Sequence, residues 1–198
     1  MAVGLHQVAP IVYSSFWQAL SRYDPDCFSS LLEELHTSRE AVMRAPNIPR
    51  QLSDVPLREF LHHLYPLKSY PSIARLAGQI ALAESAPHGF RPAHILLPSK
   101  RVRVVITQAL ELLSSLMPEV HYQQARRGGG GIFQLRGLPF IVPGLGRPTC
   151  GFVSGFVAAG LTLSDLPGLR VEEEACMSAN ENLNACVFQA GSGGEASL

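Results

Sequence analysis

The sequence is short of charge, since Asp, Glu, Lys and Arg make up 16% of its 198 residues, against roughly 25% in soluble domains generally. Sixteen basic side chains balance 16 acidic ones, so no basic excess is available to bind nucleic-acid phosphates. With 46% hydrophobic residues the chain is also too apolar to be disordered. These absences argue against direct nucleic-acid binding. A surface with so little charge favours an oligomer interface, an apolar ligand cavity, or both.

A secretory signal and a sustained apolar run are also absent. Met1 to His6 shows no basic segment followed by an apolar one. The charge-free stretches 1–21 and 148–164 are interrupted by polar residues, prolines or glycines, and fall short of the roughly 20 apolar residues of a spanning helix. We therefore expect a cytoplasmic protein with no membrane span. In such a protein the cysteines are expected to be thiols or metal ligands rather than disulfides: Cys27, Cys150, Cys176 and Cys186.

The motifs of common enzyme families are absent as well, including G-x-S-x-G, H-E-x-x-H and the Walker motif. Arg126-Arg127 precedes four glycines, but no helix follows directly, so a hairpin turn is favoured over a phosphate-binding loop. Glu59 with His63 is more typical of a solvated helix face than of a metal pair. Cys27, at a predicted helix N-terminus, has no assignable base. Enzymatic activity is therefore left open, and a non-enzymatic role is favoured.

Apolar residues at helical spacing dominate the first half of the chain. The pair Asp24-Pro25 is typical of a helix N-terminus, with Asp24 as the cap. Prolines and glycines from Pro87 to Ser99 are expected to separate the last two helices of this half. The spacing predicts helices over about residues 12–20, 25–45, 54–64, 72–80 and 99–116.

At Pro118 the pattern changes from helix to strand. Short strands are predicted over 120–125 and 132–136, flanking the glycine-rich turn, and again over 169–175 and 186–190. Between the two pairs a helix is predicted, from Cys150 to Leu163, whose glycines allow another helix or a sheet to approach closely: Gly151, Gly155 and Gly160. The order predicts an α+β fold with an N-terminal helical layer packed on a small antiparallel sheet.

The length is suited to one domain with a sizeable core. We expect this domain to span residues 1–190, mainly helical over 1–118 and built as hairpin, helix and hairpin over 119–190. The Gly-Ser-Gly-Gly sequence that follows predicts a flexible tail over residues 191–198.

Potential metal ligands are concentrated in the C-terminal part of the chain: Cys150, Glu173, Cys176 and Cys186. Three thiolates and one carboxylate can hold zinc in a tetrahedral site with no open position, which is a structural rather than a catalytic arrangement. Such a zinc ion would join the glycine-rich helix to the last hairpin. Free buried cysteines are the alternative, because they are common in proteins.

The segment CGFVSGFVAAGL (150–161), followed by VEEEAC (171–176) and CVF (186–188), resembles the C-terminal half of the 4-vinyl-reductase domain family. That family has a cysteine before a glycine-containing helix, then Glu-x-x-Cys, a short loop and Cys-x-Phe. In its phenol-sensing regulators these positions hold zinc. The resemblance therefore implies zinc ligands at Cys150, Glu173, Cys176 and Cys186. The loop between the last two cysteines has nine residues and no glycine, which makes it longer than the family's usual loop.

Upstream, residues 55–147 show a fainter resemblance. Pro56 to Leu61 and Tyr70 to Arg75 resemble a related family of uncharacterised bacterial proteins, while Ala74 to Gly78 and His88 to Leu97 resemble the bacteriochlorophyll-pathway 4-vinyl reductases. The wider superfamily includes haem nitric-oxide-binding sensors and small subunits of vesicle-tethering transport-particle complexes. Its members share a helical layer on a small antiparallel sheet and often pair as dimers.

Haem-binding sensors of this superfamily hold the haem propionates with a Tyr-x-Ser-x-Arg motif. Tyr70 and Ser72 fit this motif, but Arg75 comes one residue too late. The phenol sensors' ligand-contacting His and Trp find no match, because the only tryptophan is Trp17. No proximal haem ligand can be assigned among the histidines His88, His94 and His121. We therefore favour zinc as the cofactor over haem or another tetrapyrrole.

Proteins of this family enclose a ligand pocket between the helical layer and the sheet. The corresponding lining here is largely apolar: Leu76, Ile80, Val105, Ile106, Ala109, Tyr122, Phe133, Phe152 and Phe156. Such a pocket suits a flat hydrophobic or aromatic small molecule, oriented by a polar group such as His121 or Tyr122. A fully packed core without a cavity is the alternative.

The resulting hypothesis is a bacterial, non-catalytic module that binds or senses a small molecule and contains structural zinc. Low charge and apolar helices predict a homodimer, formed through helices in residues 10–80. Two alternatives are left open. One is a tetrapyrrole-handling protein of bacteriochlorophyll biosynthesis, and the other is a dimeric protein-interaction scaffold.

Overall fold

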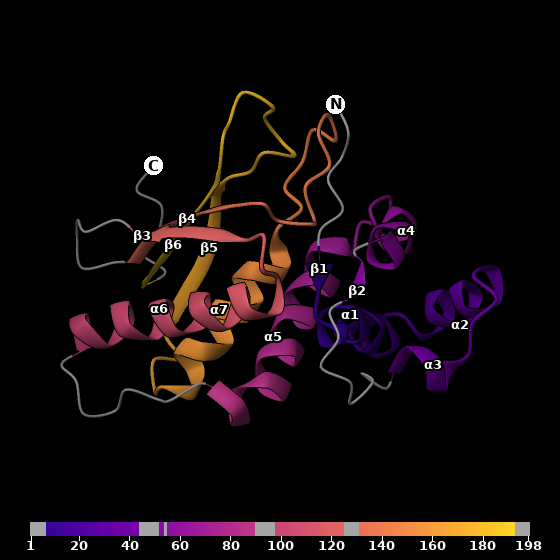
Figure 1. Ribbon diagram of the computed structural model, residues 1–198, viewed down its shortest axis with the longest axis horizontal. Helices are drawn as coiled ribbons and strands as arrows, with labels where there is room; N and C mark the ends of the chain where they lie inside the picture. The colour runs from indigo at the N-terminus through magenta and orange to yellow at the C-terminus, as the bar shows by residue number, and fades with distance from the viewer. Residues whose placement is uncertain (1–6, 44–51, 54, 90–97, 125–130, 193–198) are drawn as a thin grey trace.

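The computed structural model describes residues 7–43, 52–53, 55–89, 98–124 and 131–192 (Figure 1). The first part of the chain is mostly helical, with the elements β1 (Gln7–Val8), α1 (Pro10–Tyr23), α2 (Pro25–Glu34), α3 (Arg39–Met43), β2 (Leu52–Ser53), α4 (Val55–Leu64), α5 (Tyr70–Gly89) and α6 (Pro98–Leu116). The second part contains β3 (His121–Gln124), β4 (Gly131–Arg136), α7 (Gly151–Leu163), β5 (Leu169–Ala175) and β6 (Cys186–Ser192).

The main sheet has four antiparallel strands in the order β3-β4-β6-β5. Each outer strand is joined to its neighbour as a hairpin, and the two hairpins meet along β4 and β6. Residues alternate between the two faces of the sheet, so the buried set shares one face. On that face Phe133 of β4 stacks on its register partner Phe188 of β6, with ring centroids 5.1 Å apart.

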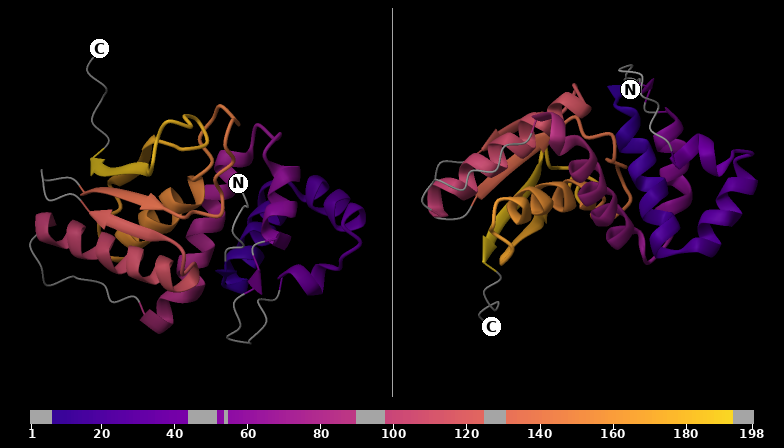
Figure 2. Two further views of the ribbon diagram at one scale, coloured as in Figure 1. Left: turned by 45° about the horizontal axis from the view of Figure 1, so that its top comes forward. Right: turned by 90° about the horizontal axis from the view of Figure 1, so that it is seen from below.

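Helices cover the apolar face of the sheet in layers. Helices α6 and α7 pack on the strands, α5 packs on α7, and α1 packs on the other side of α5. The two views of Figure 2 show the same division, with the sheet, α6 and α7 on one side of α5 and α1 to α4 on the other. Helix α5 is therefore the element that joins the N-terminal helices to the sheet.

A cluster of buried aromatic rings joins these layers into one core. Phe16 of α1 stacks on Phe152 of α7 at 5.4 Å, and Phe140, from the loop after β4, lies 5.0 Å from Phe152. Trp17 of α1 stacks on Phe60 of α4 at 4.1 Å, and all five rings are fully buried. Burying a large apolar side chain contributes roughly 1.5–3 kcal/mol, so this cluster is a major source of the stability of the fold.

Helices α5 and α7 pack more closely than side chains normally allow. A Cβ on Gly155 of α7 would overlap the carbonyl oxygen of Arg75, and a Cβ on Gly78 of α5 would overlap that of Phe152. Because glycine has no side chain, the two backbones can touch at these points. The expectation that the glycines of residues 150–163 allow a close approach is confirmed for Gly155.

The structure confirms the α+β class, the helical layer and the antiparallel sheet. Asp24 caps α2 as predicted, accepting a hydrogen bond from the backbone N–H of Cys27 at 3.0 Å. The strands on both sides of the glycine-rich turn pair with each other, although residues 125–130 themselves lie outside the described residues. No helix in the described part of the chain is long and apolar enough to span a membrane.

Several boundaries differ from the predictions. The helix expected over 25–45 is divided into α2 and α3, because the backbone at His36 adopts a left-handed φ of 48°. Helix α5 continues through Pro87 to Gly89, and the short pairing of β1 with β2 was not predicted. Strand β6 extends through Ser192, two residues into the predicted tail, while residues 193–198 lie outside the described residues.

Candidate metal centre

Three elements position the four predicted metal ligands. Cys150 is the residue immediately before α7, Glu173 lies in β5, Cys176 directly follows β5, and Cys186 begins β6. The structure therefore brings together the start of a helix and both strands of the last hairpin. All four ligand atoms lie within 4.8 Å of one another.

An irregularity in β5 explains how Glu173 and Cys176 reach the same site. In a regular strand, residues three apart point to opposite faces of the sheet. Here Glu173 pairs with Phe188 and Ala175 pairs with Val187, so β5 contains one extra residue at Glu174. Such a bulge reverses the alternation beyond it. Both ligands consequently lie on the buried side of the sheet.

The distances between the sulfur atoms suit a tetrahedral site. The Sγ atom of Cys150 lies 3.5 Å from that of Cys186 and 3.8 Å from that of Cys176, and the Cys176–Cys186 separation is 4.0 Å. Zinc–sulfur bonds of about 2.3 Å in a tetrahedron place neighbouring sulfurs about 3.8 Å apart. The three thiols therefore already have the spacing that a shared zinc ion requires, and all three are at least 97% buried.

Backbone N–H groups donate hydrogen bonds to the cluster. The amide of Thr149 donates to Sγ of Cys176 and the amide of Met177 donates to Sγ of Cys186, each at 3.4 Å. The amide of Cys150 donates to Oε2 of Glu173 at 3.2 Å. Donors of this kind stabilise negative charge on thiolates and carboxylates and orient metal ligands.

A second group of polar residues supports the loop that carries Cys150. The hydroxyls of Thr149 and Ser178 lie 2.6 Å apart, and Ser178 also accepts a hydrogen bond from the amide of Val142 at 2.9 Å. The hydroxyl of Tyr70 donates to the carbonyl oxygen of Thr149 at 2.7 Å. Sequence reasoning missed Thr149 and Ser178. Their position in the sequence was the signal that could have found them. Thr149 directly precedes Cys150, and Ser178 comes two residues after Cys176.

The protonation of the cluster follows from burial and from contacts between its members. Burial raises the pKa of the Cys150 thiol well above its usual value. Hydrogen bonds from the Cys150 and Cys186 thiols lower the pKa of Cys176 strongly. For Cys186, the hydrogen bond with Cys150 lowers the pKa, but the contact with Cys176 and burial outweigh it and raise the pKa to about 12. Burial, followed by the contact with Cys176, raises the pKa of Glu173 to about 8.

Glu173 also has a buried oxygen atom without a partner. Its Oε2 accepts the hydrogen bond from Cys150, whereas Oε1 has no hydrogen-bond partner among the described residues. A buried acceptor left unpaired costs free energy. Bonding to a cation would satisfy it, so the donor set of three sulfurs and one oxygen fits a zinc ion with no open position.

The nine predicted pocket residues lie in or against the hydrophobic core. Leu76 and Tyr122 are partly buried, and the others are buried: Ile80, Val105, Ile106, Ala109, Phe133, Phe152 and Phe156. Phe152 is in contact with the rings of Phe16, Phe140 and Phe156. The predicted lining thus comes from α5, α6, α7 and the sheet, where these layers meet.

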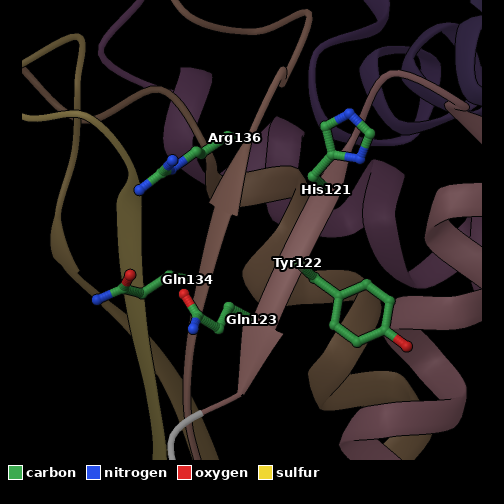
Figure 3. A pocket seen from close by; sticks show the side chains of 5 residues that line it. All are labelled: His121, Tyr122, Gln123, Gln134 and Arg136. Carbon is green, nitrogen blue, oxygen red and sulfur yellow. The ribbon is translucent and has the colours of Figure 1, made fainter.

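Two of the hollows on the described surface lie near the predicted sites. One, of about 360 Å³, lies over β3 and β4 and is lined by Tyr122 and the polar side chains of His121, Gln123, Gln134 and Arg136. Figure 3 shows the Tyr122 ring pointing away from the glutamines. The other, of about 520 Å³, lies beside the metal ligands and includes Glu173 in its lining. Of the nine predicted pocket residues, only Tyr122 contributes to either lining.

Other residues singled out in the sequence lie away from the metal ligands. His63 is paired with Glu34 of α2 at 3.4 Å. Burial raises the pKa of Cys27, which agrees with a thiol next to a helix cap rather than a reactive one. Among the histidines considered for haem, His121 is exposed at the edge strand β3, and His94 lies outside the described residues.

Comparisons with known proteins bear on the fold. No family model matches the chain, and no curated protein matches it. Among solved structures, the chain is similar to an H-NOX protein from S. oneidensis in the Fe(II)NO ligation state, with a TM-score of 0.58 and 10% sequence identity. The match covers 92% of this chain and 97% of that one. At this identity the likeness shows the fold alone, and the chain has an H-NOX-like α+β fold.

Proposed function

We propose that the chain is a non-catalytic, small-molecule-binding or sensing module of the 4-vinyl-reductase type, with a structural zinc ion. The observation that carries the metal assignment is the convergence of the four predicted ligand atoms within 4.8 Å. The sulfur spacing and the amide donors support zinc in particular. The ligands are Cys150, Glu173, Cys176 and Cys186.

A structural role follows from the number and burial of these ligands. Three thiolates and a carboxylate complete a tetrahedral shell, so no position is left for water or substrate. The ligands join α7 to β5 and β6, and Tyr70 links the same loop to α5. The zinc ion would supply an electrostatic cross-link between these elements. The aromatic contacts between α1 and α7 support treating residues 1–190 as a single domain.

Elemental analysis of the purified full chain tests the metal. We expect about one zinc per chain, retained through gel filtration and released by a thiol-modifying reagent. Replacing the zinc with cobalt(II) should produce an absorption band from cysteine-to-cobalt charge transfer, which reports thiolate ligands directly. A metal-free protein that neither acquires zinc nor develops this band would contradict the proposal.

The ligand-binding role is tested separately. The H-NOX-like fold and the apolar residues at the junction of α5, α6, α7 and the sheet support a hydrophobic or aromatic ligand. A panel of such molecules should raise the melting temperature, because a ligand that binds only the folded state stabilises it. Protein from its native host should be colourless, whereas an intense Soret-type band would favour the tetrapyrrole alternative. A panel without effect, on colourless protein, would favour the scaffold alternative.

A further inference from the structure

The hollow of about 520 Å³ beside the metal ligands has the volume and the polar lining of a ligand-binding site. It lies where the first turns of α5 and α7, the Arg147–Pro148 segment and β5 come together. Its volume is within the range of roughly 300–1,000 Å³ that is usual for small-molecule sites. It is also separate from the apolar junction proposed above for a hydrophobic ligand.

Two arginines line this hollow without an acidic partner. Arg75 of α5 is exposed and Arg147 is partly buried, and neither makes an ion pair or side-chain hydrogen bond with the residues that the structure describes. Guanidinium groups bind carboxylates and phosphates through paired, charge-assisted hydrogen bonds. As far as the described residues go, both guanidinium groups are therefore available to a ligand.

Ser154 adds a buried donor to the same wall. The residue is 2% exposed and lines the hollow, yet its hydroxyl has no hydrogen bond with any described residue. Several other helical serines bond back to a carbonyl three or four residues earlier, as Ser15 does to Val12 at 2.8 Å and Ser29 does to Pro25 at 3.0 Å, whereas Ser85 of α5 has no hydrogen-bond partner among the described residues either. The Ser154 hydroxyl oxygen is not among the fully buried atoms without a partner, so it remains accessible from the hollow, where it can donate a hydrogen bond to a bound ligand.

The backbone and the remaining charges also favour an anion. The N-terminal ends of α5 and α7 both border the hollow, and the partial positive charge of a helix N-terminus attracts anions. Two carboxylates lie on the β5 side. Glu173 faces the thiols and accepts the amide hydrogen of Cys150, so among the described lining residues Glu172 is the carboxylate left to oppose the two arginines.

We propose that this hollow binds a small organic anion whose carboxylate or phosphate group pairs with Arg75 and Arg147 and accepts a hydrogen bond from Ser154. The volume exceeds what a single oxyanion fills, and Pro71 and Pro148 supply apolar walls for the body of the molecule. The inference goes beyond the structural zinc and the hydrophobic pocket, and it does not depend on either.

Calorimetric titration of the full chain, as purified, tests the site with defined probes. Benzoate and phenyl phosphate should bind saturably and more weakly as salt rises, and inorganic phosphate should bind more weakly than phenyl phosphate. Benzamide, a neutral molecule of nearly the same shape as benzoate, should not bind. A carboxylate site should bind benzoate more tightly than phenyl phosphate, and a phosphate site should show the opposite preference. Equal binding of benzamide and benzoate, or binding of neither anion, would overturn the proposal.

Substitutions locate the binding. R75Q, R147Q and S154A should each weaken the preferred anion about tenfold or more, as expected for the loss of a charge-assisted or buried hydrogen bond. R170Q serves as a matched control, because Arg170 is an exposed arginine of β5 outside the lining. Zinc content and the circular dichroism spectrum, recorded on every variant, separate loss of the site from loss of the metal or of the fold. Unchanged affinity in R75Q and R147Q would show adventitious binding elsewhere and would exclude this site.

Discussion

Gly155 of α7 lies so close to Arg75 of α5 that a side chain at position 155 would occupy the place of the Arg75 carbonyl oxygen. This contact sets the separation of the two helices that border both the metal ligands and the anion-binding hollow. Because the obstructing atom belongs to the backbone, no rotamer change can relieve the overlap, and the helices themselves must move apart.

We therefore expect Gly155→Ala to destabilise the protein by at least about 2 kcal/mol, at the upper end of the usual cost of overpacking. The matched control is Gly168→Ala, since Gly168 has open space around the position of a Cβ and should change stability by less than about 0.5 kcal/mol. Chemical denaturation measures both. Equal stability of the two variants would show that α5 and α7 are not in backbone contact.

Cys176→Ala should destabilise the whole domain rather than one loop. Removing a ligand of a closed zinc site takes away folding free energy, so we expect a loss of more than about 4 kcal/mol, or roughly 10 °C or more in melting temperature. Cys27→Ala is the control, because Cys27 is a partly buried thiol at the start of α2. Thermal unfolding should separate the two clearly. Similar melting temperatures would contradict a structural role for the metal.

Zinc retention should decrease steeply with falling pH. In the metal-free cluster, burial raises the pKa of Cys150, and the pKa values of Cys186 and Glu173 are raised to about 12 and about 8, so all three hold protons at neutral pH. Metal ligands must be deprotonated, so zinc binding releases these protons, and the affinity for zinc falls as the pH drops below about 12 and falls more steeply below about 8, where Glu173 is protonated as well. Competition with a chromophoric chelator across this range measures the effect. A pH-independent affinity would mean that these groups are not the ligands.

We also predict that the chain is a homodimer formed through helices in residues 10–80. Tyr23, at the end of α1, is a large hydrophobic side chain in that region that is 51% exposed. Light scattering at micromolar concentration should report twice the 21.5 kDa mass of the chain. Tyr23→Glu should weaken the association if this end of α1 is part of the interface. A monomeric wild-type chain at that concentration would exclude the dimer.

Much of the fold was predictable because it depends on local patterns. The apolar spacing of α1, α4 and α6 and the alternation in β4 and β5 reflect which face of each element is buried, and that information is present in short segments. The break at His36 was not predictable in this way, because neither glycine nor proline marks it. The pairing of β1 with β2 joins two-residue strands too short to produce a pattern.

The metal ligands were predicted from their residue types and from family resemblance. The features that hold these ligands in place were not predicted. Bringing Glu173 and Cys176 to one face requires the bulge at Glu174, which depends on pairing with β6. The hollow formed by Arg75, Arg147 and Ser154 was missed for a similar reason. Its three side chains come from separate parts of the chain, and only the packing of α5 on α7 brings them together.

The strand order of the main sheet has a consequence for the rate of folding. Each hairpin pairs neighbouring segments, but the central pair joins β4 to β6, and the chain between them contains all of α7 and β5. Closing so long a loop costs entropy before its contacts form, and contacts distant in sequence slow folding. Cys150 lies within this connecting segment, and Cys186 lies at its end, where β6 begins. A zinc ion that binds both cysteines early therefore shortens the loop that must close before β4 and β6 pair. The metal is therefore expected to accelerate assembly of the sheet as well as to stabilise it.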